Sequence, residues 1–386
     1  MNFLIRLFSP IILIISIILF IYTYYKAEII WNGEKGEFYL TYYTFSISLF
    51  FISLITFFLN KSIKEYLIII LISITAGLYI FESFLNFKQY LHLNSKVKQY
   101  KFKTGKDYDT RTRIEVYNDL KKKNENVKVV VFPSSYTNEK KLFPLSSYSN
   151  AETVFCNENG YYSTYVSDRY GFNNPDKEWE AKEVEYLLVG DSFTNGACVN
   201  RPDDISSILR ELSKKSVLNL GYSSNGPLIE YATLREYMKK NVKKVLWMYY
   251  EGNDLGELDV ELLNNILVKY LENKKFSQNL KNKQNEINLK VDEKIGSEKN
   301  IRLKSKIFKF IKLTKVRYIF IVKPQKIVRP EFKQILLSAK NLVKQNDSKL
   351  YFVYLPEYAR YKTSFDNTNY LKIKKILSEL DIPLID

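Results

Sequence analysis

Ser192 closely follows a short apolar run, a position that is typical of a serine nucleophile. Residues 184–189 read VEYLLV, which is typical of a buried strand, and Gly190-Asp191-Ser192 come next. Glycine lets the backbone bend sharply at such a point. A serine at a strand-to-helix turn also lies beside free backbone N–H groups, which favour an oxyanion. The pattern suggests acyl transfer by Ser192. The alternative is an ordinary helix N-cap, where aspartate and serine are both common.

Two further clusters of small polar residues follow later apolar runs. One is Asn219–Pro227 (NLGYSSNGP), and the other is Tyr249–Asp254 (YYEGND). Each cluster alone is typical of a turn. Ligands of open α/β sheets bind at the carboxyl ends of the strands. We therefore expect Ser192, Ser224 and Asn253 to meet at one edge of a sheet.

A serine nucleophile needs a base, because an alcohol is a poor nucleophile at neutral pH. The sequence contains a single histidine, His92, in the stretch QYLHLNSK. It lies next to a long apolar run, so we interpret it as an interfacial residue and not as the base. The residues around the three clusters thus predict a nucleophile without an imidazole.

Alternating strands and helices are expected to position these clusters. Apolar runs predict parallel strands, and amphipathic periods between them predict helices, which together indicate an α/β fold. The strands are expected at 184–189, 216–220, 242–250, 349–355 and 382–385, and the helices at 204–212, 228–239, 331–344 and 370–380. The charged stretch 257–324 is too long for a simple connection. We expect a mostly helical insertion there, broken at Gly296-Ser297.

The order of the three clusters resembles the SGNH, or GDSL-type, hydrolase family. Gly190-Asp191-Ser192 matches the nucleophile block of that family, the turn around Ser224 and Gly226 the second block, and Gly252-Asn253-Asp254 the third. The wider context resembles a membrane-anchored bacterial subgroup, through CNENGYYSTYVSDRYGFNNPD, NGPLIEYATLREY and WMYYEGNDL. The resemblance covers roughly residue 150 to the C-terminus. It implies a three-layer flavodoxin-like fold with a parallel sheet.

The resemblance also implies a role for each block. Ser192 would be the nucleophile, and the oxyanion would be held by its own N–H, a backbone N–H near Ser224 and Gly226, and the Asn253 side chain. The sequence departs from the family pattern at Glu251, where a glycine is usual, and at the second block, whose usual glycine is displaced.

The family carries an Asp-x-x-His block after its last core strand, whereas this sequence ends at IPLID. Asp386 is not evidently the triad partner. We expect a reading frame truncated before that block. The alternative is a relative that lacks the catalytic histidine.

Three charge-free runs near the N-terminus predict membrane spans. They are Leu7–Tyr25, Tyr39–Leu59 and Tyr66–Phe81. The first two have the length that crosses a bilayer, and the third has it if Phe84, Leu85 and Phe87 extend it. A cleaved signal peptide is the rival for the first run, but that run is too long and lacks a small-residue cleavage site. Arg6 and the lysines of the short second loop favour an inside N-terminus and an outside C-terminal domain. Five lysines just after the third run argue the other way. We expect an inner-membrane protein with its catalytic domain outside the cytoplasm.

The net charge of +16 does not indicate a nucleic-acid partner, because the lysines are scattered and not interleaved with aromatic residues. The two cysteines, Cys156 and Cys198, have no zinc spacing, so we expect neither a metal nor another cofactor. They are candidates for a disulfide if the domain lies in an oxidising compartment, and two buried free thiols are the alternative.

The sequence therefore predicts three parts. Residues 1–87 hold three transmembrane helices, 88–180 a lysine-rich connector and accessory segment, and 181–386 an SGNH-like domain with an insertion at about 257–325. The expected function is that of a membrane-anchored esterase or acyltransferase. Its expected partners are the bilayer and an ester-bearing small molecule or polysaccharide, such as an O-acylated envelope carbohydrate. A catalytically inactive binding or assembly module is the alternative.

Overall fold

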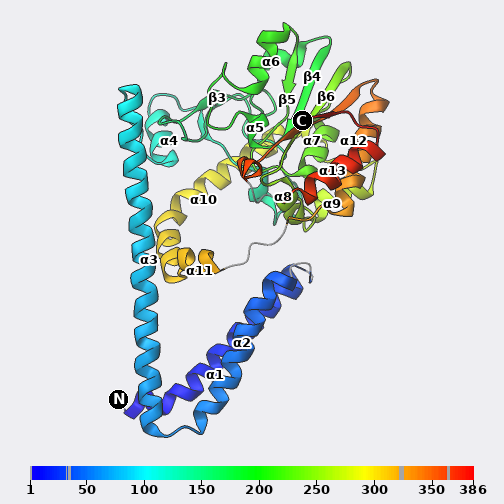
Figure 1. Ribbon diagram of the computed structural model, residues 1–386. Helices are drawn as coiled ribbons and strands as arrows, with labels where there is room; N and C mark the ends of the chain where they lie inside the picture. The colour runs from blue at the N-terminus through cyan, green and yellow to red at the C-terminus, as the bar shows by residue number, and fades with distance from the viewer. Residues whose placement is uncertain (1, 32, 34–35, 321–325, 363–365) are drawn as a thin grey trace. The chain divides into compact units, whose positions relative to one another are not determined.

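A computed structural model describes the chain except for residues 1, 32, 34–35, 321–325 and 363–365, together with the side chains of 2, 4, 37, 298–306 and 320. The described residues form two compact units (Figure 1). The first unit consists of Met1–Gln99 and Ile301–Gln325, and the second of Tyr100–Asn300 and Lys326–Asp386.

Three long apolar helices make up most of the first unit. They are α1 (Asn2–Tyr24), α2 (Gly36–Phe57) and α3 (Lys61–Thr104), and a short π-helical turn, η1 (Tyr25–Ile30), follows α1. All three are long and apolar enough to cross a membrane, as the charge-free runs predicted. Most of their large apolar side chains are exposed, as they are on helices that face lipid.

Two sequence expectations about helix ends are wrong. The stretch after residue 87 was expected to be a connector, but α3 continues through its lysines to Thr104. The break expected at Gly296-Ser297 is absent, because α10 (Gln284–Ile311) runs through both residues. One interior glycine costs a helix only about 1 kcal/mol, which a helix of 28 residues tolerates. A short helix, α11 (Thr314–Phe320), follows.

A five-stranded parallel sheet forms the core of the second unit, which confirms the predicted α/β architecture. Its strand order is β5-β4-β6-β7-β8, and every neighbouring pair is parallel. The strands are β4 (Val184–Gly190), β5 (Val217–Asn219), β6 (Val242–Tyr250), β7 (Lys349–Leu355) and β8 (Leu384–Ile385). Gly190 at the end of β4 is paired with Met248 near the end of β6. The carboxyl ends of these two strands therefore lie side by side.

The helices around this sheet are α6 (Ile205–Ser213), α7 (Pro227–Tyr237), α8 (Asp254–Glu261), α9 (Asn265–Glu272), α12 (Pro330–Gln345) and α13 (Thr368–Glu379). Four of them, α6, α7, α12 and α13, begin and end close to their predicted positions, and α8 and α9 fall in and just before the stretch expected to be a mostly helical insertion. Asp204 caps α6 by accepting the N–H of Ser207 at 3.0 Å. Helices α7 and α12 pack on each other, α7 against β4 and α12 against β7.

A smaller three-stranded sheet precedes the large one. It contains β1 (Val127–Val129), β2 (Glu152–Val154) and β3 (Thr164–Val166), in that order. Helix α4 (Arg113–Lys121) packs on β1 and starts with a capping box between Thr112 and Glu115.

A buried aspartate organises the segment that joins the two sheets. The carboxylate of Asp168 accepts four hydrogen bonds, from the backbone N–H groups of Tyr170 (2.9 Å) and Phe172 (3.0 Å) and from the side chains of Asn174 (2.9 Å) and Trp179 (2.7 Å). Burial raises the pKa of Asp168 to about 6, although these donors oppose the shift. The carboxylate therefore holds one turn of chain in a fixed shape.

We expect Asp168→Ala to destabilise this unit strongly. Four buried donors would lose their acceptor, and each unsatisfied donor costs about 1–3 kcal/mol. With partial relaxation we expect a loss of about 3 kcal/mol, which corresponds to roughly 6–12 °C in the unfolding temperature of a unit this large. The measurement is thermal unfolding of the full chain in detergent, followed by tryptophan fluorescence. Asp176→Ala is the control, because its ion pair with Arg169 is exposed and worth about 1 kcal/mol or less. Equal shifts for the two variants would contradict the role given to Asp168.

Candidate active site

Ser192 begins a one-turn helix at the carboxyl end of β4. This helix, α5, spans Ser192–Asn195, and Asp191 is its N-cap. The Asp191 carboxylate accepts the N–H of Phe193 at 3.0 Å and the hydroxyl of Ser192 at 3.1 Å. Asp191 is fully buried, whereas Ser192 is half-buried. Asp191 is therefore the N-cap, and Ser192 is the first residue of the helix that it caps.

Gly190 makes the turn before Ser192 possible. Its φ is 158°, and a Cβ added to it would lie 2.2 Å from Oγ1 of Thr194 and 2.7 Å from the carbonyl oxygen of Met248. No side chain fits this space, so the sequence needs glycine here because the neighbouring strand and α5 come so close.

Buried asparagine and serine side chains hold α5 in place. A helix this short leaves carbonyl groups without internal partners. Asn173 donates to the carbonyl oxygen of Asn195 at 2.9 Å, and Asn219 donates to that of Thr194 at 2.5 Å. Ser223 donates its hydroxyl to Oδ1 of Asn195 at 3.2 Å. Sequence reasoning missed this network, although an asparagine at the end of an apolar strand, as at position 219, is a usable signal.

The second polar cluster lies against α5, as expected. The N–H of Tyr222 donates to the carbonyl oxygen of Gly190 at 3.0 Å. Ser224 has a left-handed backbone, with φ 62°, and its N–H has no hydrogen-bond acceptor among the described residues. The N–H of Gly226 donates to Glu261 at 2.6 Å and is therefore occupied. Ser224, and not Gly226, offers the available backbone donor of this turn.

The third cluster reaches the same edge of the sheet. The ring of Tyr250 at the end of β6 lies 4.6 Å from that of Phe193 in α5. Burial raises the pKa of Asp191, and the Asn253 side chain is among the smaller influences that oppose this shift, so Asn253 lies near the nucleophile block. The Asn253 amide also donates to Glu257 at 3.0 Å.

The neighbours of Asn253 have structural roles. Asp254 accepts the N–H of Tyr250 at 2.8 Å, which closes the turn after β6. The carbonyl oxygen of Gly252 accepts from Lys326. Glu251, at the position where the family has glycine, accepts the Tyr354 hydroxyl at 2.7 Å and pairs with Arg360. This carboxylate fixes the chain after β7 and does not point to a catalytic role.

Five carboxyl groups gather beneath the three clusters, a feature that sequence reasoning missed. They come from distant parts of the chain: Asp191, Glu230, Asp254, Glu257 and Glu261. Burial raises the pKa of each one. Mutual repulsion adds to this for most of them, and the pKa is about 8 for Glu257 and about 7 for Glu261. Burial therefore favours the protonated form of these carboxyl groups, most clearly for Glu257.

The unit that carries Ser192 contains no histidine, because the sequence has a single one. His92 lies in α3, which belongs to the other unit. Asp386 follows β8 and accepts from Tyr370. Among the described residues, the hydrogen-bond partner of the Ser192 hydroxyl is the Asp191 carboxylate.

The two cysteines are joined by a disulfide next to α5. The Cα atoms of Cys156 and Cys198 are 4.9 Å apart. Asn159 donates to the carbonyl oxygen of Cys198 at 3.2 Å, and the N–H of Thr164 donates to Asn200 at 3.0 Å. The small sheet is thus tied to the segment that carries Ser192. Within the described ranges, no group of three or more His, Cys, Asp or Glu side chains is arranged to hold a metal ion.

The chain is similar to known proteins only among solved structures, and only distantly. No model of a protein family matches the sequence, and no curated protein matches it. Similar solved structures include a protein of the G-D-S-L lipolytic family from Desulfitobacterium hafniense DCB-2, with 14% identity and a TM-score of 0.27 over 53% of this chain and 77% of that one. The YXIM protein of Bacillus subtilis has 11% identity and the same TM-score over 53% of this chain and 44% of that one. At these identities and TM-scores the two structures indicate no function for this chain.

The raised pKa of Glu257 predicts how stability depends on pH. A folded pKa of about 8, above the unfolded value near 4.5, means that the folded state holds a proton which the unfolded state has released. This contribution is complete below about pH 4.5 and is lost as the pH rises through 8. We expect the unfolding temperature of the full chain to fall between pH 6 and pH 9. The underlying free energy of unfolding should lose at most about 1.4 kcal/mol per pH unit from this group.

Glu257→Gln removes the titrating group and should flatten that decline. Glu379→Gln is the matched control. Its exposed carboxylate pairs with Lys333 and has a lowered pKa, so its titration lies outside this pH window. A pH profile of Glu257→Gln that matched the parent protein would show that Glu257 is already ionised in the folded state.

Proposed function

We propose that this protein is a membrane-anchored serine esterase or acyltransferase of the SGNH type, acting on O-acyl groups of an ester-bearing substrate. The observation that carries the proposal is that Ser192 and Asn253 follow the ends of two paired strands, β4 and β6, and that the rings of the adjacent Phe193 and Tyr250 lie 4.6 Å apart. A serine hydroxyl at a helix N-terminus and an amide donor beside it are the parts that acyl transfer requires.

The reaction would proceed through an acyl-enzyme. The Ser192 oxygen attacks the ester carbonyl carbon while its proton passes to a base. The carbonyl oxygen becomes an oxyanion, which the N–H groups of Ser192 and Ser224 and the second N–H of the Asn253 amide can bind. Collapse breaks the ester C–O bond, and the leaving alcohol takes the proton. Water then attacks the acyl-serine in an esterase, and a sugar hydroxyl does so in a transferase.

This mechanism needs a general base that accepts the proton of the Ser192 hydroxyl. Asp191 accepts the Ser192 hydroxyl, but a carboxylate is a much weaker base than imidazole and serves here as the cap of α5. The proposal therefore assigns nucleophile and oxyanion binding to the described site and requires an imidazole supplied from elsewhere.

An extracytoplasmic site for this chemistry is supported by two features. The described residues include three helices that can span a membrane, and the disulfide beside α5 is of a kind that persists in oxidising compartments. An envelope carbohydrate carrying O-acyl groups is a substrate that such a location would offer.

A binding module without catalytic activity is the second candidate. It is favoured by the occupied donors, since the Gly226 N–H is taken by Glu261 and the Asn253 amide by Glu257. In that case Ser192 and its neighbours would bind an acylated ligand without cleaving it.

Free imidazole tests the proposed function directly. We expect the purified chain to hydrolyse p-nitrophenyl acetate slowly, and added imidazole to raise the rate well above its reaction with the ester in buffer, because it can act as the missing base. Ser192→Ala should abolish this extra rate. Ser213→Ala is the control, because Ser213 ends α6, ahead of β5, at the opposite edge of the sheet from Ser192. If imidazole raised the rate equally with Ser192→Ala, the binding module would be the better description.

Asn253→Ala should lower the Ser192-dependent rate in imidazole by about 10²-fold, the usual effect of losing one oxyanion donor. The check is the rate constant at saturating imidazole, with Asn264→Ala as the comparison. Asn264 is also an asparagine at a helix start, but its amide caps α9 and donates to Thr137. Comparable losses in both variants would remove Asn253 from the oxyanion site.

A further inference from the structure

A pocket within the first unit lies between α3 and α11. It has a volume of about 410 Å³. The side chains that line it are of three kinds: basic (Lys88, His92 and Lys315), amide (Gln89), and aliphatic or aromatic (Leu85, Tyr318 and Ile319). The Lys315 ammonium donates one of its three N–H groups to the Gln89 side chain. The pocket therefore combines donors for an anion with a surface for hydrocarbon.

Direct contacts fix α11 against α3 at this pocket. Glu82 is buried, and its carboxylate accepts the N–H groups of Lys315 at 3.2 Å and Val316 at 2.9 Å. The hydroxyl of Tyr79 donates to the carbonyl oxygen of Ile311 at 2.9 Å. The pocket is thus formed by two segments that are held together by hydrogen bonds.

The sequence of α3 indicates where the pocket lies across the thickness of a bilayer. The charge-free run Tyr66–Phe81 rises about 24 Å at 1.5 Å per residue, close to the hydrocarbon thickness of a bilayer. Glu82 is the first charged residue after it. Lys88 and His92, one and a half to three turns further along, therefore lie at the level of the lipid headgroups.

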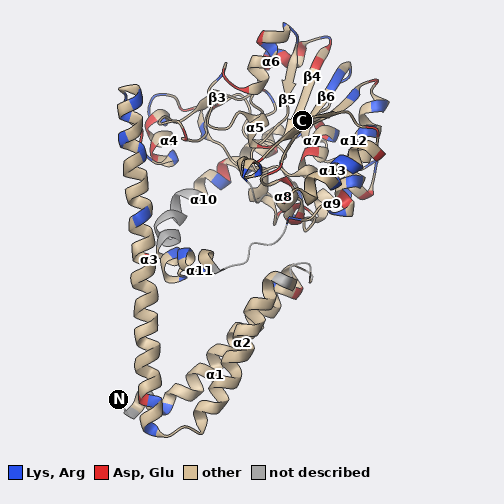
Figure 2. Cartoon of the chain, viewed as in Figure 1, with Lys and Arg blue, Asp and Glu red and all other residues tan. Residues whose placement is uncertain are grey.

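The segment that packs on α3 has the composition of a membrane-surface element. Residues 301–320 contain no Asp or Glu and the following basic residues: Arg302, Lys304, Lys306, Lys309, Lys312, Lys315 and Arg317. Figure 2 shows this positive charge on α11. Between the basic residues, apolar side chains such as Phe308, Ile311 and Ile319 are exposed. Basic residues alternating with exposed apolar ones favour an anionic lipid surface.

We propose that the pocket between α3 and α11 binds the phosphate headgroup of an anionic phospholipid. Lys88, His92 and Lys315 donate hydrogen bonds to the phosphate oxygens, and an acyl chain lies along Leu85 and Ile319. Charge complementarity selects the anionic lipid, and the apolar wall distinguishes a lipid from free phosphate. This inference is independent of Ser192 and of the proposed acyl transfer.

Native mass spectrometry of the full chain in detergent tests the site. We expect dioleoyl-phosphatidylglycerol to remain bound where dioleoyl-phosphatidylcholine is lost. The double variant Lys88→Gln with Lys315→Gln should weaken phosphatidylglycerol binding roughly 25-fold, at about fivefold per lysine. The charge-matched control is Lys98→Gln with Lys103→Gln, two exposed lysines further along α3. Equal losses in both double variants, equal retention of the two lipids, or displacement of the lipid by 10 mM inorganic phosphate would overturn the proposal.

A second measurement does not depend on the lysine variants. The only cysteines of the chain are joined in the disulfide, so a nitroxide can be placed at Ile319→Cys alone. In vesicles of three parts phosphatidylcholine to one part phosphatidylglycerol, we expect this label to be accessible to oxygen and protected from a water-soluble nickel relaxant. A label at Leu371→Cys, on exposed α13 of the second unit, should show the reverse. A water-accessible label at position 319 would exclude a lipid-facing pocket.

Discussion

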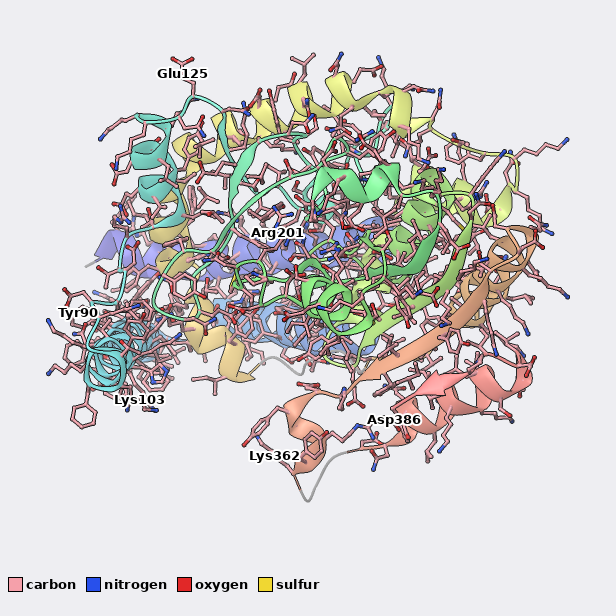
Figure 3. The ribbon with its side chains drawn as sticks, turned by 90° about the horizontal axis from the view of Figure 1, so that it is seen from above. Tyr90, Lys103, Glu125, Arg201, Lys362 and Asp386 are labelled. Carbon is pink, nitrogen blue, oxygen red and sulfur yellow. A yellow bond between two sulfur atoms is a disulfide. The ribbon has the colours of Figure 1, made fainter. Side chains whose placement is uncertain are left out.

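The position of Ser192 depends on satisfying the backbone of a helix with only one turn. Helix α5 cannot complete its own hydrogen bonds, so its carbonyl groups need partners from outside. Asn173 and Asn219 provide them from two different segments, and Asp191 caps the other end. Buried amides and carboxylates are costly unless fully paired. The same pairing that stabilises the unit therefore also fixes the helix turn that carries Ser192. Figure 3 draws the described side chains as sticks, with Arg201 and Asp386 of this unit among those labelled.

The carboxyl cluster beneath the site links electrostatics to the same geometry. Glu261 accepts three backbone N–H groups at the start of α7, from Gly226, Leu228 and Ile229. A negative group is favoured at that helix end, while burial disfavours its charge. Nearby, Glu257 accepts the Asn253 amide. The Gly226 N–H and the Asn253 amide thus already donate to carboxyl groups of the protein, Glu261 and Glu257. The protonation state of these two carboxyl groups decides how strongly they hold the donors.

Much of the fold could be predicted from local sequence. The strands at 242–250 and 349–355 agree with the structure from end to end, because runs rich in aromatic and β-branched residues leave little choice of conformation. The side-by-side ends of β4 and β6, which Ser192 and Asn253 follow, were expected from the rule that parallel strands end at one edge of a sheet. The carboxyl cluster could not be predicted, since its members are separated by up to 70 positions and meet only through tertiary packing. A helix break was wrongly predicted at Gly296, because a single glycine lowers helix stability only slightly and α10 continues through it.

The contact of Glu82 with Lys315 and Val316 has a consequence for the order of synthesis. These partners are separated by more than 230 positions. A ribosome adds about 5–20 residues per second, so Glu82 is synthesised at least about ten seconds before the N–H groups that bind its carboxylate. During that interval α3 is already made, and the whole of 100–300 emerges before the first unit receives its last segment. The first unit, with its three long apolar helices, is therefore completed only after most of the second unit has been translated.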